Sequence, residues 1–214
     1  MGYIEIHSHL LPFVDDGVGS KEQCIQVLQA YQAAGFDRIV LTPHLYNPYV
    51  ATRTKNIRPM FTWVQEAAAR VGLTMYLGGE IYVGASDNLE VLPFLGRFVL
   101  LEVNYVVEPL FLLNQAYTLL KRGFDVILAH VERYQWFTTE SMVARKLQEM
   151  GVRFQSNVDG VESGLASRWL EAGMIDIIAG DNHGDPSLPG RLAALLRKYP
   201  EVLGRMESLF QGNV

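Results

Sequence analysis

The histidines of this chain gather in four short motifs. His7 and His9 lie in EIHSH, while His44, His130 and His183 lie in LTPH, LAHVERY and AGDNH. Each motif directly follows a run rich in Val, Ile and Leu, as expected for the end of a buried strand. Imidazole nitrogens are common ligands of transition metals. The placement of all five histidines at strand ends therefore predicts a single polynuclear metal site.

Three carboxylates follow apolar runs in the same way. Glu80 ends LGGE, Glu102 ends VLLE and Asp181 follows IDIIAG. Burying an unpaired carboxylate is very costly, so each of them needs a cation or a base nearby. In the HSH and DNH motifs the two polar groups are two residues apart, which points both to one face of an extended chain. This mixture of nitrogen and oxygen donors favours Mn, Fe or Zn over Ca or Mg.

The elements that must position these side chains alternate between strands and helices. Apolar, β-branched runs predict buried parallel strands at 3–7, 38–42, 74–77, 98–101, 125–129, 153–157 and 176–179. Helical periodicity, together with Ser or Pro at helix starts and Gly at exits, predicts helices at 20–34, 61–71, 109–122, 139–150, 163–171 and 191–210. Polar residues at the ends of many strands favour a closed or nearly closed β/α barrel over an open doubly wound sheet.

The composition limits the class of protein. With 214 residues, 49% of them hydrophobic and 19% charged, we expect one compact domain over residues 1–214. The net charge of -5 argues against nucleic acid or an anionic membrane as the main partner. Cys24 is the single cysteine, and neither a signal pattern nor a membrane-spanning apolar run is present. We therefore expect a soluble, cytoplasmic protein without membrane insertion.

The order of the motifs resembles a known superfamily. HSHLLPFVDDG, LTPHLY, GGEIY, LLEVNY, AHVERY, SNVDG and AGDNHG together resemble the polymerase-and-histidinol-phosphatase (PHP) superfamily. The resemblance is closest to the bacterial protein-tyrosine phosphatases of the CpsB/YwqE type, which are encoded with capsular polysaccharide genes. It implies an α/β fold, a distorted seven-stranded β/α barrel of the PHP type, with three divalent metal ions at its carboxyl-terminal mouth. The metal is usually discussed as manganese.

The resemblance also implies how the ligands are shared among the metals. The first metal would be held by His7, His9, Glu80 and Asp181. Glu80 would bridge to the second, which would also bind Glu102 and His130. The third would be held by Asp16, His44 and His183. Asp15 is the alternative to Asp16, and Asp16 is preferred because it directly precedes Gly17.

A trinuclear cluster suits phosphomonoester hydrolysis, because metals lower the pKa of a bound water and neutralise charge on phosphoryl oxygens. We expect a metal-dependent phosphatase that acts through metal-activated hydroxide, with no covalent intermediate on Cys24. Arg133, three residues after His130, offers a planar fork of donors for phosphate oxygens. A surface ion pair is the alternative for Arg133. Arg191 matches less closely an arginine that follows the DxH motif in the family.

The stretch after His44 is dense in aromatic and basic residues. Tyr46, Tyr49, Arg53 and Arg58 are candidate contacts to an aromatic phosphate substrate. A solvated surface loop is the alternative, because charged stretches of this kind are commonly exposed.

The substrate that the resemblance implies is a phosphotyrosine protein, with a tyrosine autokinase as a candidate partner and a link to capsular or exopolysaccharide regulation. A phosphatase for histidinol phosphate or another small metabolite is the alternative within the same superfamily. A non-catalytic PHP module, stabilised by metal and used for interaction, is the alternative outside enzymes. An amidohydrolase ranks last, because Glu102 stands where a lysine would end the fourth strand. Homo-oligomerisation and the choice among Mn, Fe and Zn stay open.

Overall fold

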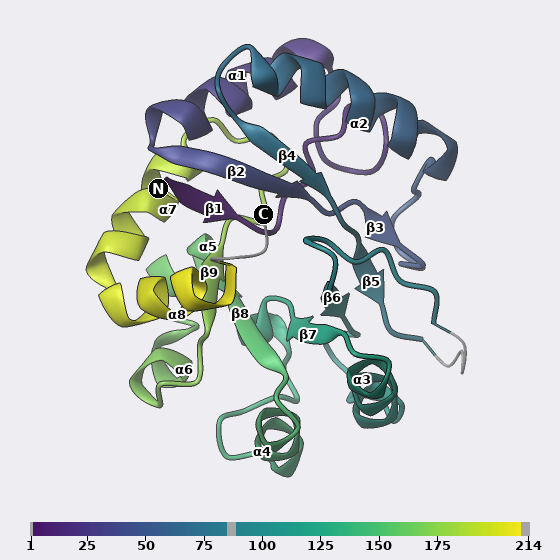
Figure 1. The fold of residues 1–214 in the computed structure, drawn as a ribbon. Helices are drawn as coiled ribbons and strands as arrows, with labels where there is room; N and C mark the ends of the chain where they lie inside the picture. Colours follow the sequence, from purple (N-terminus) through teal and green to yellow (C-terminus); the bar gives the residue numbers. More distant parts are fainter. Residues whose placement is uncertain (1, 85–88, 211–214) are drawn as a thin grey trace.

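The structure is a computed structural model that describes residues 2–84 and 89–210, and in it short strands lie inside a ring of helices (Figure 1). The strands are β1 (Tyr3–Glu5), β2 (Phe36–Leu41), β3 (His44–Leu45), β4 (Thr74–Leu77), β5 (Glu80–Tyr82), β6 (Phe98–Glu102), β7 (Asp125–Leu128), β8 (Arg153–Asn157) and β9 (Ile177–Ala179). Every pairing between these strands is parallel. The carboxyl ends of neighbouring strands therefore meet on one side of each sheet.

The strands form two sheets, in the orders β1-β2-β4 and β3-β5-β6-β7-β8-β9. A parallel bridge between Ser8 and Asn182 connects the segments that follow β1 and β9. The expected alternation of helices with parallel strands is confirmed. A single closed barrel is not found among the described residues, because the ladders of the two sheets are separate.

A pair of glycines separates β4 from β5. A Cβ atom on Gly78 would lie 2.9 Å from Cδ1 of Phe94, and one on Gly79 would lie 2.7 Å from a β3 side chain. The chain bends here, and the N–H of Glu80 donates to the carbonyl oxygen of Pro43 at 3.1 Å. Glu80 thus begins a new strand beside β3. The sequence analysis missed β3 and β5, since runs of two and three residues carry no periodicity.

The helices lie outside the strands (Figure 1). They are α1 (Lys21–Ala33), α2 (Thr54–Ala69), α3 (Leu112–Lys121), α4 (Met142–Glu149), α5 (Val158–Glu162), α6 (Ser167–Glu171), α7 (Leu188–Lys198), α8 (Pro200–Phe210) and the short 3₁₀ helix η1 (Val131–Arg133). In Figure 1, α1 and α2 lie at the top, α7 and α8 at the left, and α3 and α4 at the bottom. As the sequence predicts, Ser20 caps α1, and its Oγ accepts from the N–H of Gln23 at 3.1 Å. No described helix has both the length and the apolar character needed to cross a membrane.

Some helix predictions were wrong at their boundaries. α2 begins at Thr54 rather than at residue 61, and it contains Pro59. The stretch predicted as one helix over 191–210 is two, because Pro200 lacks the N–H that would continue α7 beyond Tyr199. The stretch 163–171 contains only the short α6, which a turn separates from α5.

The helix α8 covers the amino ends of several strands. The ring of Phe210 packs edge-on against that of Phe98 at the start of β6, with 5.0 Å between centroids. The carbonyl oxygen of Phe210 accepts from Nη1 of Arg38 on β2 at 3.2 Å.

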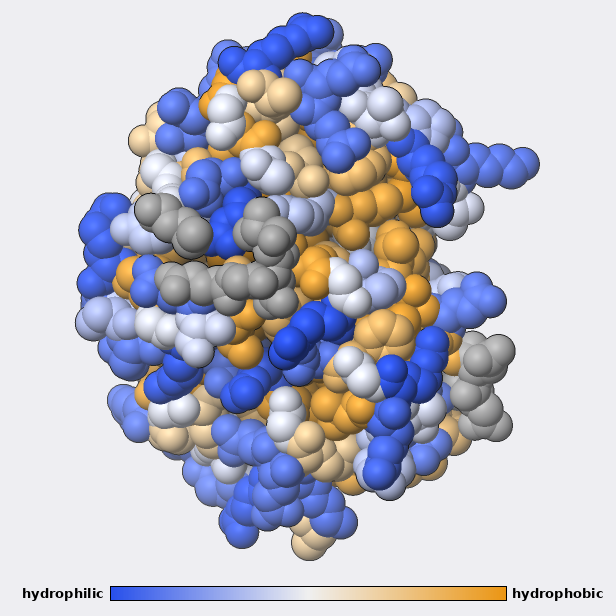
Figure 2. Space-filling model, in the orientation of Figure 1, coloured by the Kyte–Doolittle hydropathy of each residue, from blue (hydrophilic) through white to orange (hydrophobic). Residues whose placement is uncertain are grey.

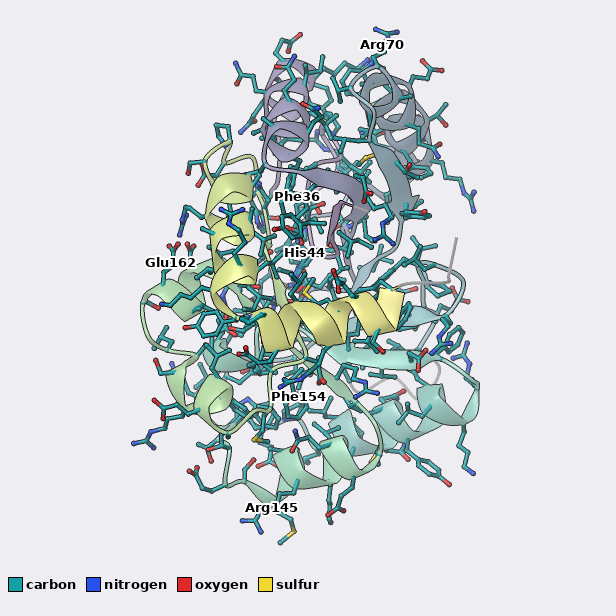
Figure 3. All side chains as sticks on the ribbon, turned by 60° about the vertical axis from the view of Figure 1, so that its left-hand side comes forward. Phe36, His44, Arg70, Arg145, Phe154 and Glu162 are labelled. Atoms are coloured by element: carbon teal, nitrogen blue, oxygen red, sulfur yellow. The ribbon has the colours of Figure 1, made fainter. Side chains whose placement is uncertain are left out.

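Hydrophilic residues dominate the outer rim of the molecule in Figure 2. In Figure 3, Phe36, His44 and Phe154 lie in the interior, whereas Arg70 and Arg145 extend outward at opposite ends.

Candidate metal centre

The predicted ligands come from many segments that end on the same side of the sheets. They lie after β1 (His7, His9 and Asp16), in β3 and β5 (His44 and Glu80), at the end of β6 (Glu102), after β7 (His130) and after β9 (Asp181 and His183). In parallel α/β proteins the active site is built at the carboxyl ends of strands. Each of these side chains lies at or after the carboxyl end of an apolar strand; His44 and Glu80 follow β2 and β4, and they begin the short strands β3 and β5.

The ligand atoms form three overlapping groups, and within each group the atoms lie within 4.8 Å of one another. The groups are His7, His9, Glu80 and Asp181; His9, Asp16, His44 and His183; and His44, Glu80 and Glu102. His130 belongs to none of these groups, but its Nε2 lies 2.8 Å from Oε1 of Glu80, which belongs to the first and the third. The structure thus brings together all the residues that the sequence analysis named as ligands. Glu80, the expected bridging residue, belongs to two groups.

The environment of Glu80 fits a cation. Its side chain is fully buried, and Oε2 has no hydrogen-bond partner among the described residues. Nevertheless, Oε2 lies 3.0 Å from Nδ1 of His44 and 3.3 Å from Nε2 of both His7 and His9. A buried carboxylate oxygen faced by imidazole nitrogens at angles unsuited to hydrogen bonding is the arrangement that a shared metal ion requires.

Without a metal, the carboxylates of the cluster raise the pKa values of the neighbouring histidines. Burial alone would lower the pKa of His44, but Glu102 and Glu80 outweigh it and raise that pKa to about 10. The pKa values of His7 and His9 are also raised, because neighbouring carboxylates outweigh burial. The buried carboxylates are therefore stabilised by nearby positive charge. Metal ions bound between the ligands would provide this charge in place of protons on the histidines.

Asp15 and Asp16 have different roles in the geometry. The side chain of Asp15 is buried, and its Oδ2 accepts from Nδ1 of His9 at 2.9 Å and from the N–H of His44 at 3.1 Å. Burial opposes ionisation, but the contact with His9 outweighs it and lowers the pKa of Asp15 to about 2. Oδ1 of Asp16 lies 3.5 Å from Nε2 of His44 and 3.4 Å from Nε2 of His183. Asp16 therefore faces the candidate ligands, whereas Asp15 orients His9 from behind.

Asp181 uses its two oxygens separately. Oδ2 accepts from Nη1 of Arg133 and from Nδ2 of Asn157, both at 2.8 Å. Oδ1 lies 3.3 Å from Nε2 of His7 and of His9. The two donors leave Oδ1 facing the histidines, as a monodentate ligand requires. Asn157 is a functional residue that the sequence analysis did not assign, although the polar run QSN at the end of a predicted strand signalled it.

Glu5 is a second residue that the sequence analysis missed. It lies within β1 and is fully buried, and it accepts from the N–H of His7, the N–H of Gly180 and the hydroxyl of Tyr31, each at 2.9 Å. Burial outweighs these contacts and raises its pKa. Glu5 joins the ends of β1 and β9, which carry the HSH and DNH motifs. A carboxylate inside an otherwise apolar strand was the available signal.

A cavity of about 470 Å³ opens beside the ligands. Apart from the ligands, its wall includes Arg133, Tyr49, Tyr82, Tyr105 and Val106. Tyr49 and Tyr82 meet edge-on, with ring centroids 6.3 Å apart.

The structure brings only some of the predicted substrate contacts to the cavity. Tyr49 and Arg133 line it, whereas Tyr46, Arg53 and Arg58 do not. Arg58 lies on α2, which begins earlier than the sequence analysis expected.

Arg191 lies away from the cavity. Its Nε donates to Oε2 of Glu162 at 3.0 Å, and its guanidinium also pairs with Asp159. The cavity lining does not include it. The structure therefore gives Arg191 a surface ion pair with α5 rather than a place beside the candidate ligands.

A model of the family "Capsular polysaccharide synthesis, CpsB/CapC" matches residues 3–213. The chain belongs to the CpsB/CapC family. The resemblance to the CpsB/YwqE type is thereby confirmed.

Two relatives of this CpsB/CapC chain carry the name tyrosine-protein phosphatase. CpsB of Streptococcus pneumoniae is 29% identical over 206 residues, which cover 87% of this chain and 85% of that protein. YwqE of Bacillus subtilis is 24% identical over 195 residues, which cover 84% of this chain and 77% of that protein.

Solved structures show the same fold. One, reported for YwqE from Bacillus subtilis and CpsB from Streptococcus pneumoniae as "unique metal-dependent tyrosine phosphatases", matches with a TM-score of 0.83 and 20% identity, and covers 99% of this chain and 92% of that chain. A zinc-containing histidinol phosphate phosphatase from Lactococcus lactis matches with a TM-score of 0.53 and 16% identity, and covers 92% of this chain and 94% of that chain. At these identities the structures share the fold with the CpsB/CapC chain.

Proposed function

We propose that this CpsB/CapC-family protein is a metal-dependent phosphomonoesterase whose substrates are phosphotyrosine proteins. The observation that carries the proposal is the convergence of histidine and carboxylate donors in three overlapping groups beside an open cavity. The names of the relatives support the choice of phosphotyrosine.

The donor chemistry suits divalent transition metals. Three ions would be held by the three groups, with His130 completing the one that contains Glu102; manganese is the first candidate, and iron and zinc are alternatives. When bound, such ions supply Lewis-acid charge that makes a water molecule acidic and neutralises phosphoryl oxygens. The protein orders the donors in advance, because Asp15, Asn157 and Arg133 hold His9 and Asp181 from outside.

Arg133 is suited to bind the phosphoryl group. It lines the cavity, and Nη1 is held by Asp181 at 2.8 Å. The rest of the guanidinium keeps N–H donors for a second anion, and its planar fork matches two phosphate oxygens.

The cavity wall suits an aryl phosphate on a protein. Tyr49, Tyr82 and Tyr105 line the cavity and can pack against a phosphotyrosine ring. Beyond Tyr105 the chain exposes apolar side chains, with Val106 62% exposed and Leu110 89% exposed. A small metabolite needs no such surface, whereas a polypeptide that carries the phosphotyrosine can cover it.

We further infer that β2 with β3, and β4 with β5, each act as one kinked strand. The chain would then form the distorted seven-stranded PHP barrel, joined between β1 and β9 through the Ser8–Asn182 bridge. We propose a single domain over residues 1–214 and a cytoplasmic setting in which a tyrosine autokinase of capsule or exopolysaccharide synthesis is the substrate. Homo-oligomerisation stays a prediction.

The test compares substrates on protein loaded with Mn²⁺. Phosphotyrosine peptides should be hydrolysed faster than phosphoserine peptides and faster than histidinol phosphate. The protein should hold more than one metal per chain, and Glu80→Gln should lose metal and activity while remaining folded, because Glu80 belongs to two ligand groups. Much faster hydrolysis of histidinol phosphate would refute the tyrosine phosphatase assignment. Saturation at one metal per chain would refute the trinuclear site.

The exposed apolar segment gives a separate test of the protein substrate. Leu110→Asp should lower kcat/KM for a phosphotyrosine peptide by about 5-fold, equivalent to about 1 kcal/mol, and should leave para-nitrophenyl phosphate hydrolysis unchanged. Leu165→Asp is the matched control, since Leu165 is also exposed, at 66%, but lies on another segment, just before α6. Equal peptide kinetics for the two variants would remove this segment from substrate binding.

A further inference from the structure

We propose that Gln155 is a positioning residue that orients His7 and, through Asn157, Asp181 toward the metal centre. The inference rests on the proposed metal centre and adds a determinant of how its ligands are ordered. Gln155 lies on β8 and is fully buried. It is not a member of any of the three ligand groups. Its importance comes from the direction of the hydrogen bonds that pass through its amide.

One backbone group determines how the Gln155 amide is turned. The N–H of His130 lies 3.0 Å from Oε1 of Gln155, and a backbone N–H can only donate. The atom that faces it must therefore be the carbonyl oxygen. The amide nitrogen Nε2 then faces Oδ1 of Asn157 at 2.6 Å and donates to it. The orientation of an amide is commonly inferred from a whole network, but here a single unambiguous donor suffices.

The orientation of Gln155 in turn determines the tautomer of His7. Oε1 of Gln155 also lies 3.2 Å from Nδ1 of His7, and an amide oxygen can only accept. Nδ1 must therefore carry a proton. The other ring nitrogen, Nε2, is left to face the carboxylates of Glu80 and Asp181, each at 3.3 Å. A histidine that donates from one nitrogen and ligates through the other is the arrangement that orders a metal site.

The same chain of hydrogen bonds reaches the ligand from β9. Because Oδ1 of Asn157 accepts from Gln155, its Nδ2 is the atom that donates to Oδ2 of Asp181 at 2.8 Å. Oδ1 of Asp181 is then the oxygen that faces His7 and His9 at 3.3 Å. The backbone N–H of His130 thus sets the orientation of four side chains, Gln155, His7, Asn157 and Asp181, of which His7 and Asp181 belong to the first ligand group.

An apolar side chain of similar size could fill the volume of Gln155 but could not replace these bonds. Without Gln155 the N–H of His130 and Oδ1 of Asn157 would both be buried without a partner, which is unfavourable. Asn157 would then be free to turn its amide and present oxygen to oxygen at Asp181. A packing role and a positioning role therefore predict different effects on metal affinity.

The test measures Mn²⁺ binding to metal-free full-length protein by isothermal titration calorimetry, with urea unfolding in parallel. Gln155→Glu is the decisive variant. It keeps the size and the acceptor for His130, but at about pH 8 it places a carboxylate oxygen against Oδ1 of Asn157. The Asn157 amide must then turn to donate to residue 155, and it no longer donates to Asp181. We expect Mn²⁺ affinity to fall about 10- to 100-fold. Attraction between charges alone predicts tighter binding, since the variant adds a negative charge.

Two further variants complete the test. Gln155→Met should weaken Mn²⁺ binding over the same range, because it removes all three hydrogen bonds of the Gln155 amide. Ser156→Ala is the matched control, since Ser156 is the fully buried neighbour on β8 and takes no part in the hydrogen bonds of Gln155. Its Mn²⁺ affinity should stay within about twofold of the unmodified protein, which is the usual scatter for a neutral change.

The outcomes separate the two proposals. If the unmodified protein binds no Mn²⁺, the proposed metal centre fails. If it binds Mn²⁺ and Gln155→Glu binds as tightly or more tightly while folded, the positioning role of Gln155 is refuted. If Gln155→Met does not fold, Gln155→Glu still gives the answer, because it retains the size and the polarity of the buried side chain.

Discussion

Arg133 illustrates how a single residue serves both the cluster and the substrate. Its pKa is raised, because Asp181 and its other neighbours outweigh burial, so it stays charged throughout the working range. One edge is held by Asp181 and the side chain lines the cavity, 40% exposed. Arg133 follows His130 by only three residues. The short helix η1 begins directly after His130 and ends at Arg133, which keeps the arginine beside the ligands.

Arg133→Ala should therefore reduce kcat/KM for a phosphotyrosine peptide by an amount equivalent to about 2 to 4 kcal/mol. Metal content should not change, because Asn157 still donates to Asp181. The measurement is steady-state kinetics together with metal analysis of the same sample. Arg145→Ala, on the exposed side of α4, is the control. An unchanged kcat/KM would return Arg133 to a surface ion pair.

Cys24 provides a test of the mechanism at the same scale. Its thiol is buried and donates to the carbonyl oxygen of Leu10 at 3.2 Å, and burial raises its pKa to about 12. At about pH 7.5 it is therefore a thiol rather than a nucleophilic thiolate. Iodoacetamide should leave the folded protein unlabelled and active, and should label it in urea, as read by mass spectrometry. Rapid inactivation of the folded protein would contradict this prediction.

At the scale of the secondary-structure elements, the two ends of the strands have different roles. The carboxyl ends carry the ligands, whereas α8 packs on the amino ends through Phe210 and Phe98. Parallel pairing makes this separation possible, because every strand points its last residue to the same side. A change at the amino ends should therefore affect stability and leave the chemistry intact.

Phe210→Ala should lower the free energy of unfolding by about 3 kcal/mol, because Phe210 is 1% exposed and its loss leaves a cavity. Mn²⁺ stoichiometry and kcat should be retained at temperatures where the variant is folded. Urea unfolding and metal analysis check the two parts. Loss of metal from the folded variant would show that α8 influences the distant ends of the strands.

For the molecule as a whole, metal binding and protonation compete for the same nitrogens. The pKa values of His7, His9 and His44 are raised in the metal-free protein, that of His44 to about 10. A group whose pKa lies above the working pH is protonated there, so a metal that takes its nitrogen must displace the proton. Higher pH leaves fewer protons to displace.

Mn²⁺ binding should therefore release protons at about pH 7, and its apparent affinity should increase as the pH rises toward the pKa of His44. Calorimetry in two buffers with different ionisation enthalpies measures the number of protons released. Binding that neither releases protons nor depends on pH would show that the histidines are already unprotonated in the metal-free protein.

Local patterns were sufficient for much of the architecture. The strands 74–77 and 153–157 were predicted with the bounds that the structure has, and Ser20 was recognised as the cap of α1. Except for Asp16, which only the resemblance supplied, the ligands could be named because they follow apolar runs, and burying such a residue is costly without a partner. The family likeness supplied the grouping, which the residues alone did not.

The tertiary structure decided the features that depend on contacts between distant segments. Asp15 and Asp16 are neighbours in the sequence, and only the folded loop shows which one faces His44 and His183. Arg191 lies close to the DNH motif along the chain, yet α5 draws it into a surface ion pair. The hydrogen bonds of Gln155 and Asn157 join β8 to the segments after β1, β7 and β9. Periodicity reports the local conformation and burial of a residue, whereas its partners depend on the order and bending of the strands.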